Sequence, residues 1–235
     1  MQLFVTEYTK KDTTITIINE ELLSQLRKVL RAKIGDTLWI QSPAQESKKT
    51  RYEVRIDTWD TTHIISKIIS EQIHELTPKL TTMIIAMPNK REKAELIVQK
   101  LTECGIDQII FWPSERSVVK AWNVKKEERL HKIIKEALEQ SRGRNLPKLQ
   151  FTTDIAPYVK NTEVIIFDKD KENIFIHQVT RNSLPVTWVI GPEGGLTDKD
   201  YQLFQPYQPK IMSLGATILR METAAIIGGW IVKNN

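Results

Sequence analysis

The sequence predicts an α/β protein of two domains, a small β-barrel domain over residues 1–73 and a domain with a parallel sheet over residues 74–235. Short runs of β-branched and aromatic residues, separated by turn formers, fill the first third of the chain and are typical of short strands. From residue 80 onward, strand patterns alternate with helix patterns, which indicates a sheet with parallel order. The largely apolar run Val186–Ile190 is typical of a parallel strand that is covered on both faces.

In the first domain, the β-like runs predict strands over residues 3–6, 13–18, 36–41, 52–59 and 63–69. Residues 21–33 predict a basic amphipathic helix, because apolar residues recur at helical spacing on one face. That face consists of Leu22, Leu23, Leu26, Val29 and Leu30. The polar residues 42–50 predict an exposed hairpin loop, and residues 71–78 predict a linker to the second domain.

In the second domain, we expect strands over residues 80–87, 106–112, 164–168, 186–190 and 211–214. A helix capped by Asn89 follows the first strand and ends at Gly105, a residue suited to the left-handed conformation. Residues 113–117 predict a polar loop at the carboxyl edge of the sheet, and residues 124–140 predict a second helix. The final helix, residues 222–232, is apolar nearly all round, so we expect it to be buried between two subunits.

Composition excludes several classes of protein. Hydrophobic residues make up 40% of the 235 residues, and no run approaches the roughly 20 apolar residues of a membrane span. The first residues lack the pattern of a signal peptide, so we expect a cytoplasmic protein. The single cysteine, Cys104, is expected to pack in the core, and the four histidines lack metal-ligand spacing, so no metal is predicted. A net charge of +5 favours an anionic partner such as nucleic acid.

Two glycine-bearing segments follow predicted strands. The first is Gly-Pro-Glu-Gly-Gly at residues 191–195, and the second is Ser-Leu-Gly-Ala-Thr-Ile-Leu-Arg-Met-Glu-Thr-Ala at residues 213–224. Glycine permits positive φ and lets a flat ligand lie directly on the main chain, so two such loops side by side predict a pocket. The signatures of dinucleotide-binding folds, P-loops and serine hydrolases are absent from the sequence.

These two loops, together with three further motifs, resemble the RsmE family of 16S ribosomal RNA uridine-N3 methyltransferases. The further motifs are Ser-Glu-Arg-Ser-Val-Val-Lys at residues 114–120, Glu-Gln-Ser at residues 139–141, and Leu-Arg-Lys-Val-Leu-Arg at residues 26–31 followed by Gly-Asp at residues 35–36. Their order and spacing match as well, and the similarity covers essentially the whole chain. The resemblance implies a PUA-like N-terminal barrel and a C-terminal SPOUT domain with a deep trefoil knot.

The resemblance also implies a homodimer that uses S-adenosyl-L-methionine to methylate N3 of a uridine in the decoding region of 16S rRNA, in the small ribosomal subunit. Arg220 would stabilise the uracil anion or orient the ring, and Glu193 or Glu222 could receive the N3 proton. Two other roles remain open, because Glu222 could cap the last helix and Glu193 could bond its own loop. The residues expected to hold the cofactor are Ile190, Gly191, Gly194, Gly195, Leu214, Gly215, Ile218 and Leu219. Those expected to contact RNA are Arg27, Lys28, Arg31, Lys33, Arg116, Lys120, Arg142 and Arg144.

Three departures from the family pattern accompany this resemblance. Thr217 stands where relatives commonly carry a basic residue, Arg142 and Gly143 stand where Gly-Arg is usual, and Gln25 stands near a position that is often histidine. A different SPOUT target, such as a ribose hydroxyl or transfer RNA, is one alternative function. A non-catalytic RNA-binding module that kept the fold is another, and the intact Arg220 and loop glycines argue against it.

Overall fold

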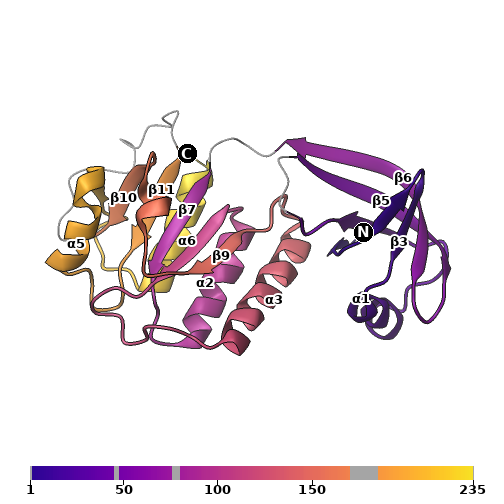
Figure 1. Ribbon diagram of the computed structural model, residues 1–235, viewed down its shortest axis with the longest axis horizontal. Coiled ribbons are helices and arrows are strands. Elements are labelled where there is room, and N and C mark those ends of the chain that lie inside the picture. Colours follow the sequence, from indigo (N-terminus) through magenta and orange to yellow (C-terminus); the bar gives the residue numbers. More distant parts are fainter. Residues whose placement is uncertain (1, 45–47, 76–79, 170–184, 235) are drawn as a thin grey trace. The chain divides into compact units, whose positions relative to one another are not determined.

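The computed structural model describes residues 2–44, 48–75, 80–169 and 185–234. The chain divides into two compact units (Figure 1). The first contains Met1–Leu76 and Leu138–Leu146, and the second contains Thr77–Ala137 and Pro147–Asn235. The segment 138–146, which the sequence analysis placed in the second domain, therefore packs with the first unit.

The first unit is built on a six-stranded sheet with the order β1-β4-β5-β6-β3-β2. Its strands are β1 (Leu3–Val5), β2 (Thr9–Lys11), β3 (Thr14–Ile17), β4 (Thr37–Gln41), β5 (Lys48–Trp59) and β6 (Ile64–Glu75). β1 pairs with β4 in parallel, and the other neighbours are antiparallel. Apolar residues of β3, β4, β5 and β6 form the core together with Leu22, Leu23 and Leu26.

The helix predicted over residues 21–33 is shorter and changes type along its length. α1 (Glu20–Ser24) is capped by the Asn19 side chain and continues as a π-helical turn, η1 (Gln25–Val29). A π-turn bonds residue i to i+5, which rotates the following residues away from the apolar face of the α-helix. Val29 is 71% exposed and Leu30 41% exposed as a result, so the predicted place of these two residues on the buried face is wrong.

Two strand boundaries in the first unit also differ from prediction. β5 begins at Lys48 and β6 ends at Glu75, so residues 48–50 and 71–75 are strand rather than loop and linker. Lys48 pairs with Glu75 at the end of this long ribbon, because backbone pairing with the neighbouring strand overrides the weak β-propensity of polar residues. β2 escaped prediction because it is a three-residue edge strand whose residues are all exposed.

The second unit contains a wholly parallel six-stranded sheet with the order β12-β10-β11-β7-β8-β9, as predicted for this part of the chain. The strands are β7 (Thr81–Ala86), β8 (Gln108–Trp112), β9 (Lys148–Phe151), β10 (Glu163–Phe167), β11 (Val186–Ile190) and β12 (Lys210–Met212). The central strand β7 is buried at every position, which explains its lack of hydrophobic alternation.

Helices cover both faces of this sheet (Figure 1). On one face, α4 (Ala156–Val159) and α5 (Asp198–Phe204) share a core with β7, β8, β10 and β11, and the 3₁₀ turn η3 (Gln205–Tyr207) follows α5. On the other face, α6 (Met221–Asn234) packs against α2 (Arg91–Glu103), β7 and β11. A Cβ at Gly229 would lie 2.4 Å from Leu101 Cδ2, so this glycine allows the close approach of α6 to α2. α3 (Val124–Ser141) is joined to α2 by an ion pair between Arg129 and Glu95.

The helix ends in the second unit confirm one prediction and correct another. Gly105 has φ +79° directly after α2, as its predicted helix-ending role requires. The N-cap of α2 is Lys90, not Asn89, and its side chain makes no capping hydrogen bond. The Asn89 N–H donates to the Glu193 carboxylate at 3.3 Å. α6 keeps two apolar side chains exposed within one chain, Ile227 at 37% and Trp230 at 58%.

Among the described residues, no helix is both long and apolar enough to cross a membrane. Across the same parts of the chain, no group of three or more histidine, cysteine, aspartate or glutamate side chains could hold a metal ion.

Candidate functional site

A cavity of about 630 Å³ lies in the second unit where β10, β11 and β12 end. Its volume falls in the range typical of small-molecule sites, and the carboxyl edge of a parallel sheet is the usual place for such a site. Both glycine-bearing loops contribute to its wall. Of the residues predicted to hold the cofactor, only Gly215 does not line this cavity. Those that do line it are Ile190, Gly191, Gly194, Gly195, Leu214, Ile218 and Leu219. Glu193 and Arg220 line it as well.

The loop at residues 191–195 is a tight turn that exposes its backbone to the cavity. The Gly195 N–H donates to the Pro192 carbonyl at 2.9 Å, and Gly195 has φ +73°, a conformation that glycine adopts without strain. The Gly194 carbonyl accepts a 2.6 Å hydrogen bond from Arg116 Nη1. This loop is therefore held by a side chain that reaches it from the segment after β8.

The loop at residues 213–220 begins with a turn closed by a side chain. Ser213 Oγ accepts from the Gly215 N–H at 3.3 Å and donates to the Gly215 carbonyl at 2.9 Å. Gly215 has φ +138°, a backbone conformation that side-chain-bearing residues rarely adopt. Further along, Ile218 is 78% exposed and lines the cavity, so an apolar side chain is available to a ligand.

A cation–carboxylate cluster lies beside the cavity. Lys93 Nζ, from the first turn of α2, is 2.6 Å from Glu193 Oε1 and 3.9 Å from Glu222 Oε2. Lys93 and Glu193 line the cavity, whereas Glu222 is not part of its wall. Lys93 thus connects α2 to the first loop and to the first turn of α6.

This environment lowers the pKa of Glu193 below its usual value. Partial burial acts to raise the pKa, but the hydrogen bond from Lys93, backbone N–H groups including that of Asn89, and the Lys93 charge together outweigh it. Glu193 therefore stays ionised near neutral pH and is a weak base.

The segment after β8 is fixed by several hydrogen bonds. The hydroxyl groups of Ser114 and Ser117 are 2.8 Å apart and buried, and the Glu115 N–H donates to the buried Asp200 carboxylate at 3.0 Å. Lys120 Nζ donates to the carbonyls of Ser114 at 2.5 Å and Glu115 at 3.0 Å. Two residues predicted to contact RNA, Arg116 and Lys120, are thus already bonded to backbone carbonyls.

Arg220 contrasts with these anchored side chains. It is exposed and lines the cavity, and within the described residues its guanidinium makes no hydrogen bond or ion pair. Its backbone carbonyl accepts from the Ala224 N–H at 2.8 Å, which ties it to the start of α6. A free guanidinium at the mouth of a cavity can stabilise negative charge on a ligand.

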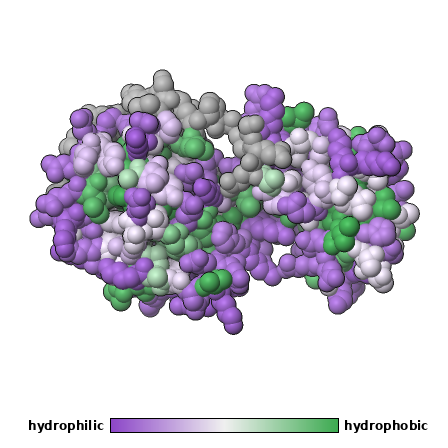
Figure 2. Space-filling model, in the orientation of Figure 1, coloured by the Kyte–Doolittle hydropathy of each residue, from purple (hydrophilic) through white to green (hydrophobic). Residues whose placement is uncertain are grey.

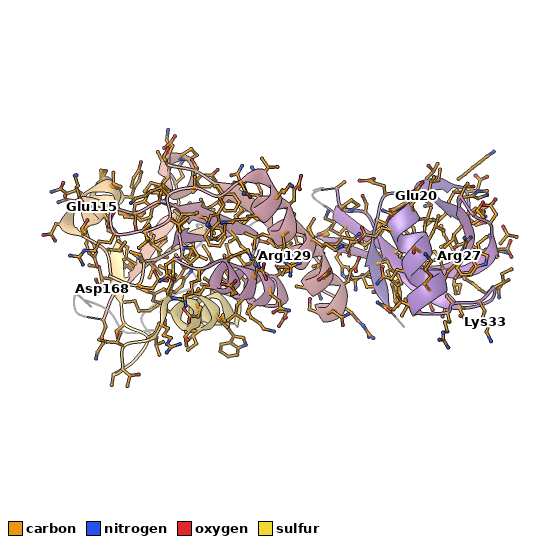
Figure 3. All side chains as sticks on the ribbon, turned by 90° about the horizontal axis from the view of Figure 1, so that it is seen from below. Glu20, Arg27, Lys33, Glu115, Arg129 and Asp168 are labelled. Atoms are coloured by element: carbon orange, nitrogen blue, oxygen red, sulfur yellow. The ribbon has the colours of Figure 1, made fainter. Side chains whose placement is uncertain are left out.

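The basic residues of the first unit are positioned in two groups. Arg27 lies over the Trp59 ring at 5.2 Å from its centroid, while Lys28, Arg31 and Lys33 are exposed (Figure 3 labels Arg27 and Lys33). The second group follows α3, where Arg142 and Arg144 are exposed. The carbonyls of Arg142, Gly143 and Arg144 accept hydrogen bonds from the buried side chains of Arg51 and Gln41.

Hydrophilic residues occupy much of the face drawn in Figure 2, and hydrophobic ones form separate patches on it. The exposed basic side chains of each unit, which the hydropathy colours do not distinguish from acidic ones, can contact an anionic partner.

Sequence reasoning missed several residues of the cavity wall. Asp168 follows β10, lines the cavity and accepts a hydrogen bond from the Tyr201 hydroxyl. Figure 3 shows Asp168 at the same end of the second unit as Glu115. Its position at the end of a predicted strand was a usable signal. Lys93 gave no such signal, because it lies on a helix about a hundred residues before the loops. The other wall residues outside the two glycine-bearing segments are Phe167, Lys169, Leu196 and Met212.

Comparison with known proteins agrees with this arrangement. The sequence model of a family described as the RNA methyltransferase domain matches residues 75–231. The chain is 27% identical over 235 residues to ribosomal RNA small subunit methyltransferase E of Rickettsia conorii, covering 96% of this chain and 91% of that protein. It is 29% identical over 246 residues to the protein of the same name from Bacillus subtilis, covering 96% and 93%.

Among solved structures, the ribosomal RNA small subunit methyltransferase E of Neisseria gonorrhoeae bound to S-adenosyl methionine has a TM-score of 0.80 at 20% identity, covering 97% of this chain and 95% of that one. A methyltransferase of Legionella pneumophila in complex with the same cofactor has a TM-score of 0.79 at 23% identity, covering 98% and 95%. These likenesses extend over both units of the chain and support the fold. The resemblance stated from the motifs is confirmed, and the chain belongs to the RNA methyltransferase domain family.

Proposed function

We propose that this protein transfers a methyl group from S-adenosyl-L-methionine to N3 of a uridine in the decoding region of 16S rRNA, in the small ribosomal subunit. The observation that carries the proposal is a single cavity whose wall unites the two glycine-bearing loops with an exposed arginine, Arg220, whose guanidinium makes no bond in the described residues. The names of the full-length relatives support a small-subunit rRNA substrate. We place the reaction in the cytoplasm.

The residues of the cavity suit this cofactor. Backbone groups of Gly191, Gly194, Gly195 and Leu214 would bind the adenine and ribose, while Ile218 and Leu219 would pack on their apolar faces. Gly215, which does not line the cavity, would act by shaping the loop through its positive φ. The cofactor would supply a methyl group on a positively charged sulfonium. The described residues contain no group of three or more side chains that could hold a metal ion.

Arg220 is the proposed catalytic residue. Uracil N3 carries a proton at neutral pH, so the N3–H bond must break before or as the N3–CH₃ bond forms, and negative charge spreads onto O2 and O4. The S–CH₃ bond of the donor breaks in the same transfer, and S-adenosylhomocysteine leaves as a neutral thioether. A guanidinium that makes no competing contact can bond those oxygens and lower the cost of losing the proton. Arg220 meets this condition, because it is exposed at the cavity and has no partner in the described chain.

Glu193 is the second proposed site residue, and its contacts favour one of its two predicted roles. Its lowered pKa makes it a poor acceptor for the N3 proton, while its bonds to Lys93 and the Asn89 N–H hold the first loop in place. We therefore assign Glu193 to shaping the cavity and leave the proton to solvent. Glu222 is not part of the cavity wall, so we do not assign the N3 proton to it either.

For RNA contact we propose the basic residues of both units. Arg27, Lys28, Arg31 and Lys33 would bind phosphates from the first unit, as would Arg142 and Arg144, whose side chains are exposed. Arg116 and Lys120 would contribute charge beside the cavity in addition to their bonds with backbone carbonyls.

The finer description of the fold is also part of this proposal. We infer that residues 1–73 form a PUA-like barrel domain, that residues 74–235 form a SPOUT domain with a trefoil knot, and that the protein is a homodimer. The first compact unit adds residues 74–76 and 138–146 to the barrel domain. The exposed Ile227 and Trp230 on α6 support a dimer, because a partner would cover apolar surface that one chain leaves in water.

The test is methyl transfer to small subunits that lack the modification, using labelled cofactor and mapping the modified nucleotide. We expect one labelled uridine, methylated at N3. The Arg220→Ala variant should bind S-adenosylmethionine as the wild type does and lose transfer, and Arg220→Lys should retain part of it. Transfer to another atom or to transfer RNA, or full activity of Arg220→Ala, would overturn the proposal.

A further inference from the structure

A second cavity lies on the same edge of the parallel sheet, where β7, β8 and β9 end. Its volume is about 360 Å³, and it shares no lining residue with the first cavity. β7 is the neighbour of β11, whose end contributes to the first cavity, so the two cavities follow one another along the sheet edge. The proposed function gives the second cavity no role.

Aromatic rings form one wall of this second cavity. Phe111 and Phe151 are stacked, with ring centroids 5.4 Å apart and planes 19° from parallel. The Trp122 ring is tilted against both, at 5.7 Å from Phe111 and 5.9 Å from Phe151. Phe111 is fully buried and supports the other two rings, which are only partly buried and present aromatic surface to the cavity. Surfaces of this kind stack unpaired nucleobases whatever their sequence.

Two charged groups complement the rings. Lys120 lines the cavity, and its ammonium uses two of its three N–H donors on the carbonyls of Ser114 and Glu115, which leaves one donor. Glu127, in the first turn of α3, also lines the cavity, and its carboxylate makes no bond within the described residues. A nucleobase carries carbonyl acceptors and N–H donors on its edge, so a cation and a carboxylate beside an aromatic wall match it.

The segment between the two cavities is held by hydrogen bonds. Arg116 bonds the Gly194 carbonyl at the first cavity, while Lys120, four residues later, lines the second. The buried Ser114–Ser117 contact fixes the segment between them. A base bound in the second cavity would therefore hold its strand at a fixed position relative to the first.

We propose that the second cavity is a stacking site for an unpaired nucleobase of the rRNA substrate, next to the nucleotide that is methylated. This inference rests on the proposed function. It assigns Trp122 as the stacking residue and Glu127 as an acceptor for the edge of the base.

The test compares Trp122→Ala, Trp122→Phe and Glu127→Gln in the full chain, with unmodified small subunits as the RNA. We expect Trp122→Ala to raise the KM for small subunits about 5- to 150-fold, the range for losing one base stack, and to leave the Kd for S-adenosylmethionine unchanged. Trp122→Phe keeps an aromatic face, so its KM for small subunits should be close to that of the wild type. Glu127→Gln removes a charge without removing packing, and should raise the KM by a smaller factor.

Filter binding of the same subunits, without cofactor, separates this inference from the proposed function, because it needs no methyl transfer. Weaker binding by Trp122→Ala with recovery in Trp122→Phe supports the stacking site even if the wild type methylates another atom. Wild-type RNA binding and KM in Trp122→Ala would overturn it. Equal loss of cofactor and RNA binding in Trp122→Ala, with no change in Glu127→Gln, would also overturn it and leave Trp122 as a packing residue.

Discussion

Replacing Lys93 with methionine removes one cation and preserves most of the side-chain volume. In the wild type, Lys93 Nζ lies 2.6 Å from Glu193 Oε1 and 3.9 Å from Glu222 Oε2, and Glu222 Oε2 is buried without a hydrogen-bond partner in the described residues. The substitution therefore leaves two carboxylates on either side of an apolar side chain. It should loosen the loop at residues 191–195 and destabilise the second unit.

The size of this effect follows from the exposure of the groups. A hydrogen bond to a charged group contributes about 1.5–3 kcal/mol. The side chains of Lys93 and Glu193 are 22% and 31% exposed, so water can compensate in part, and we expect a loss of about 1.5 kcal/mol. For a chain of this length, that loss corresponds to a fall of about 3–6 °C in Tm.

The pH dependence gives a second readout. Because the pKa of Glu193 is lowered in the folded protein, its ionisation stabilises the fold above the unfolded-state pKa, and this stabilisation is lost as the pH falls through the folded-state value. Without Lys93, the folded-state pKa rises toward the ordinary value. The free energy of unfolding of Lys93→Met should therefore differ most from that of the wild type at neutral pH, and the two should converge in acid.

Urea unfolding at a series of pH values, together with calorimetric titration of S-adenosylmethionine, measures both effects. Lys93→Arg keeps the cation and should behave nearly as the wild type. Lys100→Met is the matched control, because its partner Glu103 is an i,i+3 neighbour on the same helix and such pairs contribute only about 0.2–0.5 kcal/mol. Equal stability of Lys93→Met and Lys100→Met at every pH, with unchanged cofactor affinity, would refute the reasoning.

Three further predictions concern the loops and the basic residues. Gly215→Ala places a Cβ at φ +138°, which costs about 1–3 kcal/mol of strain, so calorimetry should show weaker cofactor binding. Arg116→Met removes the bond to Gly194 and should raise the cofactor Kd about fivefold, whereas a purely RNA-binding arginine would change only the KM for small subunits. Replacing both Arg27 and Arg31 with glutamate should weaken rRNA binding and leave cofactor affinity unchanged. The slope of log K for rRNA against log salt concentration should become shallower by about 0.7 per lost phosphate contact. A salt slope equal to that of the wild type would contradict the last prediction.

The parts of the molecule that sequence predicted well are those set by local rules. The parallel sheet follows from apolar strands that alternate with helices, and the wall of the first cavity follows from glycine loops at strand ends. Gly105 has the positive φ that its place after a helix requires. In each case, the residues that determine the structure are neighbours in sequence.

The features that sequence missed depend on contacts between distant residues. The role of Lys93 arises only when α2 is brought to Glu193, a hundred residues later. The segment 138–146 joins the first unit because Arg51 and Gln41 bond its carbonyls, which no local pattern in that segment records. The π-turn at Gln25 interrupts a hydrophobic periodicity that would suit a longer α-helix, so periodicity alone overextended it.

The central claim is that the two glycine-bearing loops form the methyl-donor site beside Arg220. A crystal structure of the protein soaked with S-adenosylmethionine tests it most directly. The account predicts the cofactor against the backbone of residues 191–195 and 214–219, with its methyl group facing the Arg220 side. Cofactor bound elsewhere, or bound in the cavity with its methyl group sealed away from Arg220, would contradict it.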